Sequence, residues 1–367
     1  PATAGFLFYN VLPLYLGRLQ ESTGLETSQI GLIASTYFLG FNLVSLSSYF
    51  WVRKLPPLQT ALGGTLALIA ILLLAPHSNE FLFQAIVSAA IGGLSGGIGT
   101  IGVTIAGDTD NSTRWYGIQV ATEALAGVVL LFLLPATLIP AYGFSGLIYG
   151  MVITILILLP SFFFLSRTPL QDSGQSSSKP GDRHGPARSS LHAWMGLIAM
   201  ACLFVGSAAI WAFVERIAAI NAFDPEAVGQ MLGFSLFFAV LGSLAAGALS
   251  DRFGNVWPYI LNCLILLGGV LTIAVTKNLT LYSVGACVFM FGWAAAFAYL
   301  FAIISDVDPN GRFIALSVPA VGIGSMVGPG AAGFLLSGDT TTSLQIMCVA
   351  SILAALILGW LSDRPEH

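Results

Sequence analysis

Long apolar stretches separated by short polar connections dominate the chain from end to end. Several stretches reach the ~20 residues that an α-helix needs to cross the hydrocarbon core of a bilayer. The connections carry most of the charges, as in "VRKLPP" after residue 51 and "GDTDNSTR" after residue 106. The pattern predicts twelve membrane-spanning helices, at about 1–18, 28–50, 56–76, 80–106, 115–139, 143–166, 192–218, 227–249, 256–276, 280–304, 312–336 and 342–361.

One connection is much longer than the others. The segment "RTPLQDSGQSSSKPGDRHGPARSS" (167–190) is charged and rich in Ser, Gly and Pro, which is typical of a flexible linker. It predicts three parts: an N-terminal six-helix bundle (1–166), a linker (167–190) and a C-terminal six-helix bundle (191–367). The first apolar run is short for a span, so we expect the protein to extend upstream of Pro1.

Composition strengthens the membrane prediction. Of the 367 residues, 56% are hydrophobic and 8% are charged, whereas soluble domains carry about 25% charged residues. The fold class expected is therefore all-α, a polytopic membrane protein. The four cysteines lie inside apolar runs and are expected to pack between helices, not to form disulfides or bind metal.

The chain lacks the motifs of the common enzyme classes. It has no nucleophile elbow, phosphate-binding loop or HExxH sequence, and no stretch that could form a soluble nucleotide domain. We therefore expect neither an enzyme nor an ATP-driven pump, and no cofactor, metal or nucleic-acid partner.

Basic residues indicate the orientation. If both termini and the linker share one side, ten Lys and Arg residues lie there and three on the other, a bias that marks the cytoplasmic face. The ten are Arg53, Lys54, Arg114, Arg167, Lys179, Arg183, Arg188, Arg252, Arg312 and Arg364; the three are Arg18, Arg216 and Lys277. We expect a multi-pass protein of the cell (inner or plasma) membrane with cytoplasmic termini and linker, working as a monomer.

The two halves are related in sequence. "GDTDNSTRWYG" follows the fourth span and "SDVDPNGRFIA" follows the tenth, so that their Asp and Arg residues match at a constant offset of 198. The same offset pairs Arg18 with Arg216 and Gly31 with Gly229. Two copies of a six-helix unit in parallel orientation predict a pseudo-two-fold axis along the membrane normal and a site between the halves at mid-depth.

The connection between the eighth and ninth spans, "GALSDRFGNVWP", resembles the loop motif Gly-x-Leu-x-Asp-Arg-x-Gly-Arg of the major facilitator superfamily. Gly247, Asp251, Arg252 and Gly254 fit the motif, while Asn255 replaces its last basic residue. The resemblance implies a transporter that works by alternating access, with the charges of the loop locking the cytoplasmic side. The equivalent N-terminal loop, "SYFWVRKLPP", keeps basic charge and lacks the acid.

Other departures limit what the resemblance implies about the subfamily. The fourth span has no arginine, which many proton-coupled members carry there. The fifth span lacks the Gly-x-x-x-Gly-Pro motif of antiporter-type exporters, and a version occurs in the eleventh span at Gly324, Gly328 and Pro329. This weakly favours uptake, that is, a symporter.

Glu123 is the deepest titratable group predicted. It lies nine residues beyond Arg114, which places it roughly 13 Å along a helix and near the midplane. Charged groups inside a span are costly and are candidates for function. Glu123 is expected to bind and release a proton or to contact the solute, the alternative being a neutral acid that joins helices by hydrogen bonds.

Arg18 and Arg216 occupy equivalent positions toward the outer ends of the first and seventh spans. They could bind an anionic solute, with Glu215 as the counter-ion of Arg216 and a second proton-coupling candidate. The alternative is that they anchor the helices at the outer interface.

Two further sets complete the predicted sites. The cytoplasmic gate is expected at charged helix ends: Asp251, Arg252, Asp108, Arg114, Asp306 and Arg312. The solute is expected to meet polar and aromatic side chains inside the spans: Tyr9, Asn10, Tyr37, Gln119, Trp211, Trp293 and Tyr299.

These observations predict a secondary active, proton-coupled transporter of a small organic solute, with an organic anion slightly favoured. Alternatives are an exporter of lipophilic cations or drugs, a transport-inactive sensor or binding protein, and a lipid-moving protein.

Overall fold

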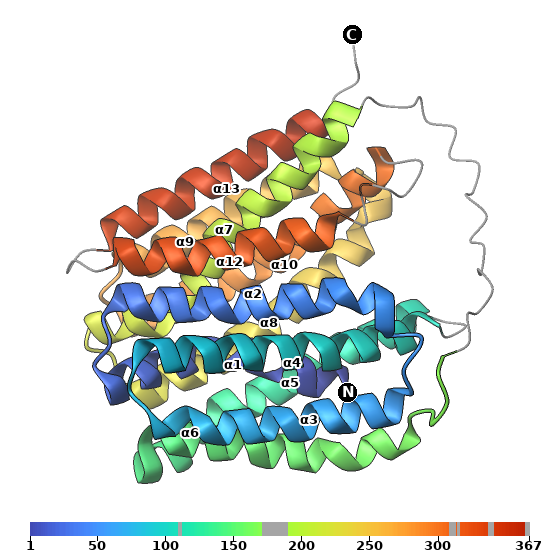
Figure 1. Cartoon of the computed structure of the whole chain (residues 1–367). Coiled ribbons are helices and arrows are strands. Elements are labelled where there is room, and N and C mark those ends of the chain that lie inside the picture. Colours follow the sequence, from blue (N-terminus) through green and yellow to red (C-terminus); the bar gives the residue numbers. More distant parts are fainter. Residues whose placement is uncertain (109–111, 171–189, 308–312, 314–315, 337–340, 364–367) are drawn as a thin grey trace. The chain divides into compact units, whose positions relative to one another are not determined.

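The fold is that of a computed structural model, which describes residues 1–108, 112–170, 190–307, 313, 316–336 and 341–363; the side chains of 107, 112–117, 120–121, 190 and 249–253 lie outside the description. Every long element in the described part is an α-helix, and no strand occurs there (Figure 1). The helices are α1 (Ala2–Thr23), α2 (Thr27–Trp51), α3 (Pro57–Leu74), α4 (Phe81–Gly107), α5 (Ser112–Ala136), α6 (Leu138–Leu158), α7 (Ser190–Ile220), α8 (Pro225–Phe253), α9 (Val256–Val275), α10 (Leu279–Val307), α12 (Ser317–Leu335) and α13 (Thr342–Ser362).

These helices match the predicted spans closely. Short 3₁₀ helices, η1 (Ala75–His77) and η2 (Leu159–Phe164), continue α3 and α6. α6 bends at Gly143, where φ is +58°, a left-handed value that glycine adopts without strain. The regular part of α6 therefore begins where the sixth span was predicted to begin.

Ten of the described helices are long and apolar enough to cross a membrane, and α5 contributes a shorter apolar stretch, Thr122–Ala136. α1, with 22 residues, is about 33 Å long at 1.5 Å per residue. The predicted fold class, an all-α polytopic membrane protein, is confirmed.

The chain forms two compact units. Unit 1 comprises Pro1–Ser176 and Pro225–Gly233, and unit 2 comprises Ser177–Asp224 and Phe234–His367. The start of α8 thus groups with unit 1, although its sequence belongs to the predicted C-terminal bundle. The division into six-helix bundles at 1–166 and 191–367 stays a prediction.

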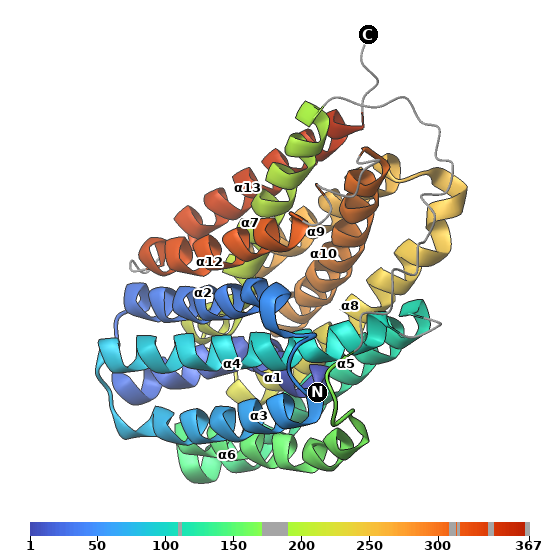
Figure 2. The same cartoon turned by 45° about the vertical axis from the view of Figure 1, so that its right-hand side comes forward.

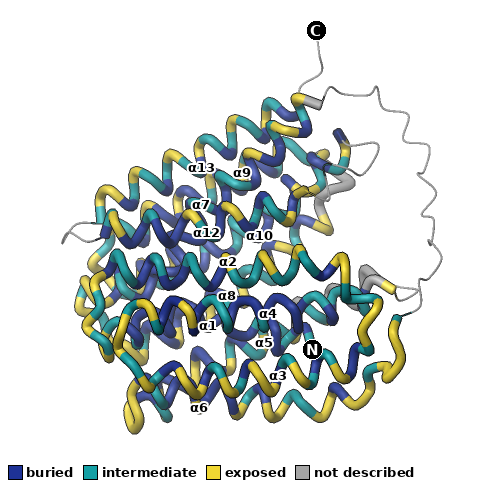
Figure 3. The backbone as a smooth tube through the Cα atoms, in the orientation of Figure 1, coloured by how far each residue is buried: buried dark blue, intermediate teal, exposed yellow. Residues whose placement is uncertain are grey.

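Unit 1 is built around the contact of α2 with α4, the most extensive in that unit. Glycines allow the close approach, since a methyl group on Gly92 would overlap the backbone carbonyl oxygen of Tyr37, and one on Gly96 would lie 2.6 Å from that of Phe41. α3 and α6 lie side by side in this unit and are lined with exposed residues (Figures 1 and 3).

Unit 2 is organised differently. α10 packs most extensively against α9, while α7 packs against both α12 and α13, as the turned view also shows (Figure 2). The predicted eleventh-span glycines lie on α12, where a methyl group on Gly324 or Gly328 would overlap the backbone oxygen of Ala201 or Val205 on α7. These glycines therefore serve helix packing in the structure.

Candidate functional site

The structure brings three of the predicted site residues of unit 1 together. The Asn10 side chain on α1 donates a 3.0 Å hydrogen bond to the backbone oxygen of Glu123 on α5. Gln119, one turn before Glu123, hydrogen-bonds its carboxyl group. The Glu123 Oε1 atom is buried and has no hydrogen-bond partner among the described residues. A carboxyl group with one oxygen unsatisfied can accept a proton or a donor group of a solute.

A second group of side chains joins α1, α2 and α4. The Tyr37 ring stacks on Phe8 at 4.8 Å, and the Tyr9 ring meets Phe38 edge-on at 6.0 Å. The Tyr37 and Ser95 hydroxyl groups are buried neighbours, but their geometry makes no full hydrogen bond. Polar tips on an aromatic wall can orient a partly apolar solute.

A pocket of about 310 Å³ opens between α1, α4 and α5 in the same unit. Gln119 lines it, together with Thr3 and Thr122, whose hydroxyl groups lie 3.1 Å apart. Thr122 precedes Glu123 in α5, so the pocket reaches the helix turn that carries the buried carboxyl group.

Arg18 and Arg216 differ in their surroundings. Arg18 forms an ion pair of 2.7 Å with Glu21 on the same helix, and its side chain is 12% exposed. Arg216 on α7 is half-buried, and no ion pair of Arg216 occurs in the described part of the chain. Glu215 is buried beside Tyr282, whose hydroxyl group donates a 2.6 Å hydrogen bond to the backbone oxygen of Val214.

Of the three aromatic candidates of unit 2, Trp211 and Tyr299 are buried. Trp293 is half-buried and packs near Phe204 at 5.9 Å and parallel to Phe297 at 6.4 Å. The buried indole Nε1 of Trp293 has no hydrogen-bond partner among the described residues. It is a donor that a solute could satisfy.

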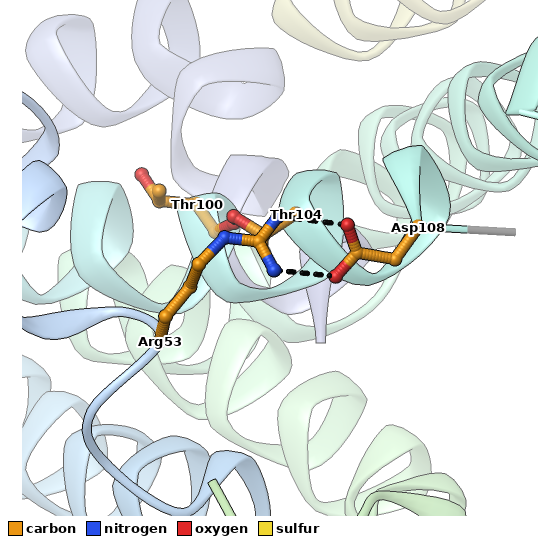
Figure 4. A network of polar contacts seen from close by, with 4 residues as sticks. All are labelled: Arg53, Thr100, Thr104 and Asp108. Atoms are coloured by element: carbon orange, nitrogen blue, oxygen red, sulfur yellow. Dashed lines mark hydrogen bonds and ion pairs between the residues drawn. The ribbon is translucent and has the colours of Figure 1, made fainter. Parts of the chain in front are cut away.

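At the end of α4, Asp108 is held by Arg53, which was not among the predicted gate residues. Arg53, just after α2, donates two hydrogen bonds to the Asp108 carboxylate, of 2.8 and 3.1 Å (Figure 4). The parallel, two-bonded geometry is the strongest arrangement for an arginine and a carboxylate. Thr100 and Thr104, which are drawn beside the pair, lie on α4 in the turns before Asp108.

The repeat-related acid in unit 2 has a neutral partner. Asn255 donates a 2.7 Å hydrogen bond to Asp306 at the end of α10. Asn255 is the residue that departs from the loop motif, so the substitution keeps a hydrogen bond to the helix end. The sequence shows both partners as polar loop residues, Arg53 after the second span and Asn255 after the eighth, but it does not show which helix end each one faces.

Four predicted gate residues fall outside the description. The side chains of Arg114, Asp251 and Arg252 and the whole of Arg312 are not among the described parts. Their role stays a prediction. In the described residues no cluster of three or more His, Cys, Asp or Glu side chains could hold a metal ion.

Part of the chain matches the sequence pattern of a known family, and the whole chain shares its fold with solved proteins. The family model of the Major Facilitator Superfamily matches residues 196–367. No curated protein sequence matches the chain. Two solved transporters share the fold. A bacterial homolog of the human lysosomal transporter Spinster, in an inward-facing and occupied conformation, is 14% identical with a TM-score of 0.73, over 98% of this chain and 94% of that one. The nucleoside transporter NupG is 14% identical with a TM-score of 0.76, over 99% and 98%.

These likenesses and the apolar helices show a multi-pass membrane protein with the fold of the two transporters. Residues 196–367 match the family's sequence pattern, and the whole chain has the fold of these transporters. The matched region is slightly less than half of the chain, and it includes the loop motif at Gly247–Pro258 that resembles this family.

Proposed function

We propose that the protein is a secondary active transporter that couples the movement of a small organic solute to protons by alternating access. Its solute is an organic molecule with an aromatic or apolar part, and an organic anion is slightly favoured. It works as a monomer in the cell membrane, with its termini and linker on the cytoplasmic side.

The buried Glu123 carboxyl group is the observation that carries this proposal. Its Oε1 atom lacks a hydrogen-bond partner among the described residues, and its helix is tied to α1 through Asn10. A carboxyl group in such surroundings changes its proton affinity when its hydration changes. Alternating access changes the hydration of a mid-membrane group twice in each cycle, so Glu123 is suited to couple proton movement to transport.

The charged helix ends support a cytoplasmic gate. Asp108 with Arg53 and Asp306 with Asn255 hold repeat-related helix ends to the preceding loops. Movement of either loop would have to break these bonds, which makes them suited to stabilise one conformation over another. The Arg53–Asp108 contact is an ion pair, so it is expected to weaken as the salt concentration rises.

The proposal is tested by measuring solute uptake into vesicles that contain the purified protein, with and without an imposed pH gradient. The solutes are first selected by their ability to raise the unfolding temperature. The unaltered protein is expected to accumulate such a solute in response to the gradient. Glu123→Gln is expected to bind the solute and to lose the response to the gradient, because the amide does not take up a proton.

The matched control is Glu80→Gln, which removes an exposed carboxylate at the start of α4. It is expected to keep gradient-driven uptake. Unchanged coupling in the Glu123 variant would refute the proton role. Binding without any flux in the unaltered protein would point to a sensor, and resistance to lipophilic cations in cells that express it would point to an exporter.

A further inference from the structure

Basic and aromatic side chains from two distant segments gather at one edge of unit 1. The turn after α2 carries Arg53 and Lys54, and the segment after η2 carries Arg167. A hydrogen bond of 3.1 Å from the backbone nitrogen of Leu58 to the oxygen of Ser166 joins the two segments. The hydrogen bond thus brings Arg167 to the same edge as Arg53 and Lys54, which lie more than one hundred positions earlier in the sequence.

The edge is hollowed into a pocket of about 390 Å³. Its lining combines aromatic, basic and aliphatic side chains from both segments: Tyr49, Phe50, Val52, Arg53, Lys54 and Leu170. The turn is well formed, since the backbone nitrogens of Lys54 and Leu55 both bond to the oxygen of Trp51. The pocket is therefore part of an ordered turn.

Large aromatic side chains at this edge are exposed. Tyr49 and Phe50 are 86% and 67% exposed, and Phe163 and Phe164 are 63% and 92% exposed. They stand where α2 and α6 end, the level at which aromatic side chains meet lipid headgroups in membrane proteins. The rings can lie among the acyl chains while the cations face the headgroups.

The charge at this edge is not balanced locally. No Asp or Glu occurs in 49–58 or 159–170. Asp108 forms the two hydrogen bonds to Arg53 already described, and in the described part of the chain no ion pair holds Lys54 or Arg167. The corresponding loop of unit 2, "GALSDRFGNV", contains Asp251 beside Arg252. The repeat therefore does not impose the positive edge.

We propose that this edge, defined by Tyr49, Phe50, Lys54 and Arg167, binds the headgroup of an anionic phospholipid of the surrounding bilayer. Lys54 and Arg167 contact the phosphate, and the aromatic rings pack on the glycerol and upper acyl chains. Arg53 stays bonded to Asp108, which offsets its charge, so Lys54 and Arg167 supply the net positive charge of the edge. Clusters of basic residues next to a span attract anionic lipids in this way.

The test uses the purified full chain in phosphatidylcholine vesicles to which phosphatidylglycerol is added in steps, with the midpoint of thermal unfolding as readout. The midpoint is expected to rise to a plateau in the unaltered protein. In the double variant Lys54→Gln with Arg167→Gln, the apparent affinity for phosphatidylglycerol is expected to fall about fivefold for each cation removed.

Lys277→Gln is the matched control, because Lys277 is an exposed lysine in the turn before α10. It is expected to keep the full response. The charge-preserving pair Lys54→Arg with Arg167→Lys is expected to keep it too, and this pair remains informative if the neutral variant does not fold. A response in the neutral variant equal to that of the unaltered protein would overturn the proposal. So would an equal rise produced by inorganic phosphate in pure phosphatidylcholine, since it would show an ion site and not a lipid site.

Discussion

Arg18 and Arg216 show at the scale of single residues how equivalent positions of a repeat can have different chemistry. Arg18 shares its charge with Glu21, one turn later on α1, at 2.7 Å. The residue that corresponds to Glu21 at the offset of 198 is Ala219, so the same pair cannot form on α7. An arginine with a fixed carboxylate partner gains less from an incoming anion than one without such a partner.

We therefore expect Arg216→Gln to weaken the binding of a transported organic anion more than Arg18→Gln does. Loss of a hydrogen bond to a charged group costs about 1.5–3 kcal/mol, which corresponds to a dissociation constant roughly 10- to 150-fold higher. Titration of the anion against the unfolding midpoint of each variant measures the effect. A larger loss in the Arg18 variant, or no loss in either, would contradict the assignment of the anion to Arg216.

At the scale of helices, the glycines of α4 decide how unit 1 packs. "IGGLSGGIGT" places small residues along one side of α4, and Gly92 and Gly96 meet the backbone of α2 directly. The corresponding stretch of α10, "FGWAAAFAYLF", is bulkier, and in unit 2 the closest packing is that of α10 with α9. There a methyl group on Gly292 would lie 2.6 Å from the backbone nitrogen of Leu266. Helices in membranes depend on such small residues because apolar side chains gain little by leaving lipid.

The α2–α4 contact leads to a prediction about stability. Gly92→Ala is expected to destabilise the protein by about 1–3 kcal/mol, because its methyl group would push against the carbonyl of Tyr37. Gly63→Ala on α3 is the control, since no atom lies within 4 Å of the added methyl group. The midpoint of thermal unfolding in detergent should fall for the first variant only. Equal unfolding midpoints for Gly92→Ala and Gly63→Ala would show that α2 and α4 can move apart without loss of stability.

At the scale of the whole molecule, the bias of basic residues predicts which ends of the helices face the cytoplasm. Ten of the thirteen Lys and Arg residues fall on the side of the linker when twelve spans are assumed. The described helices lie close to those spans in the sequence, and ten of them are long and apolar enough to cross a membrane. Which side is cytoplasmic is predicted only from the rule that Lys and Arg are enriched on the cytoplasmic side.

Cysteine labelling tests this orientation. Ser176→Cys in the linker and Asn278→Cys in the α9–α10 connection are introduced separately, and intact cells are treated with a membrane-impermeant maleimide. The cysteine at 278 is expected to react in intact cells, and the one at 176 only after the membrane is opened. The unaltered protein controls for its own four thiols, of which Cys263, Cys287 and Cys348 are buried and Cys202 is partly exposed. The reverse labelling pattern would show that the chain is inserted the other way.

The sequence predicted which residue types belong to the candidate site and roughly how deep in the membrane they lie. Glu123, Asn10 and Gln119 were each recognised as polar groups inside spans, because such groups stand out against an apolar background. Their contact with one another could not be predicted, because it depends on how α1 and α5 are rotated about their axes. The partners Arg53 and Asn255 were missed for the same reason, since they lie 55 and 51 residues away from the acids that they hold.

The sequence by itself determined the class of the protein. The length and apolarity of the spans determine the number of helices. A segment that crosses a bilayer needs about 20 apolar residues, and its backbone N–H and C=O groups must be hydrogen-bonded within the helix. The repeat and the loop motif then indicated the family. Only the tertiary structure decided which helices touch, which carboxylates are held by a cation and which by an amide, and that Lys54 and Arg167 share one edge. Such contacts are decided by the packing of side chains and backbone between helices far apart in sequence, and hydropathy along a single helix contains no information about them.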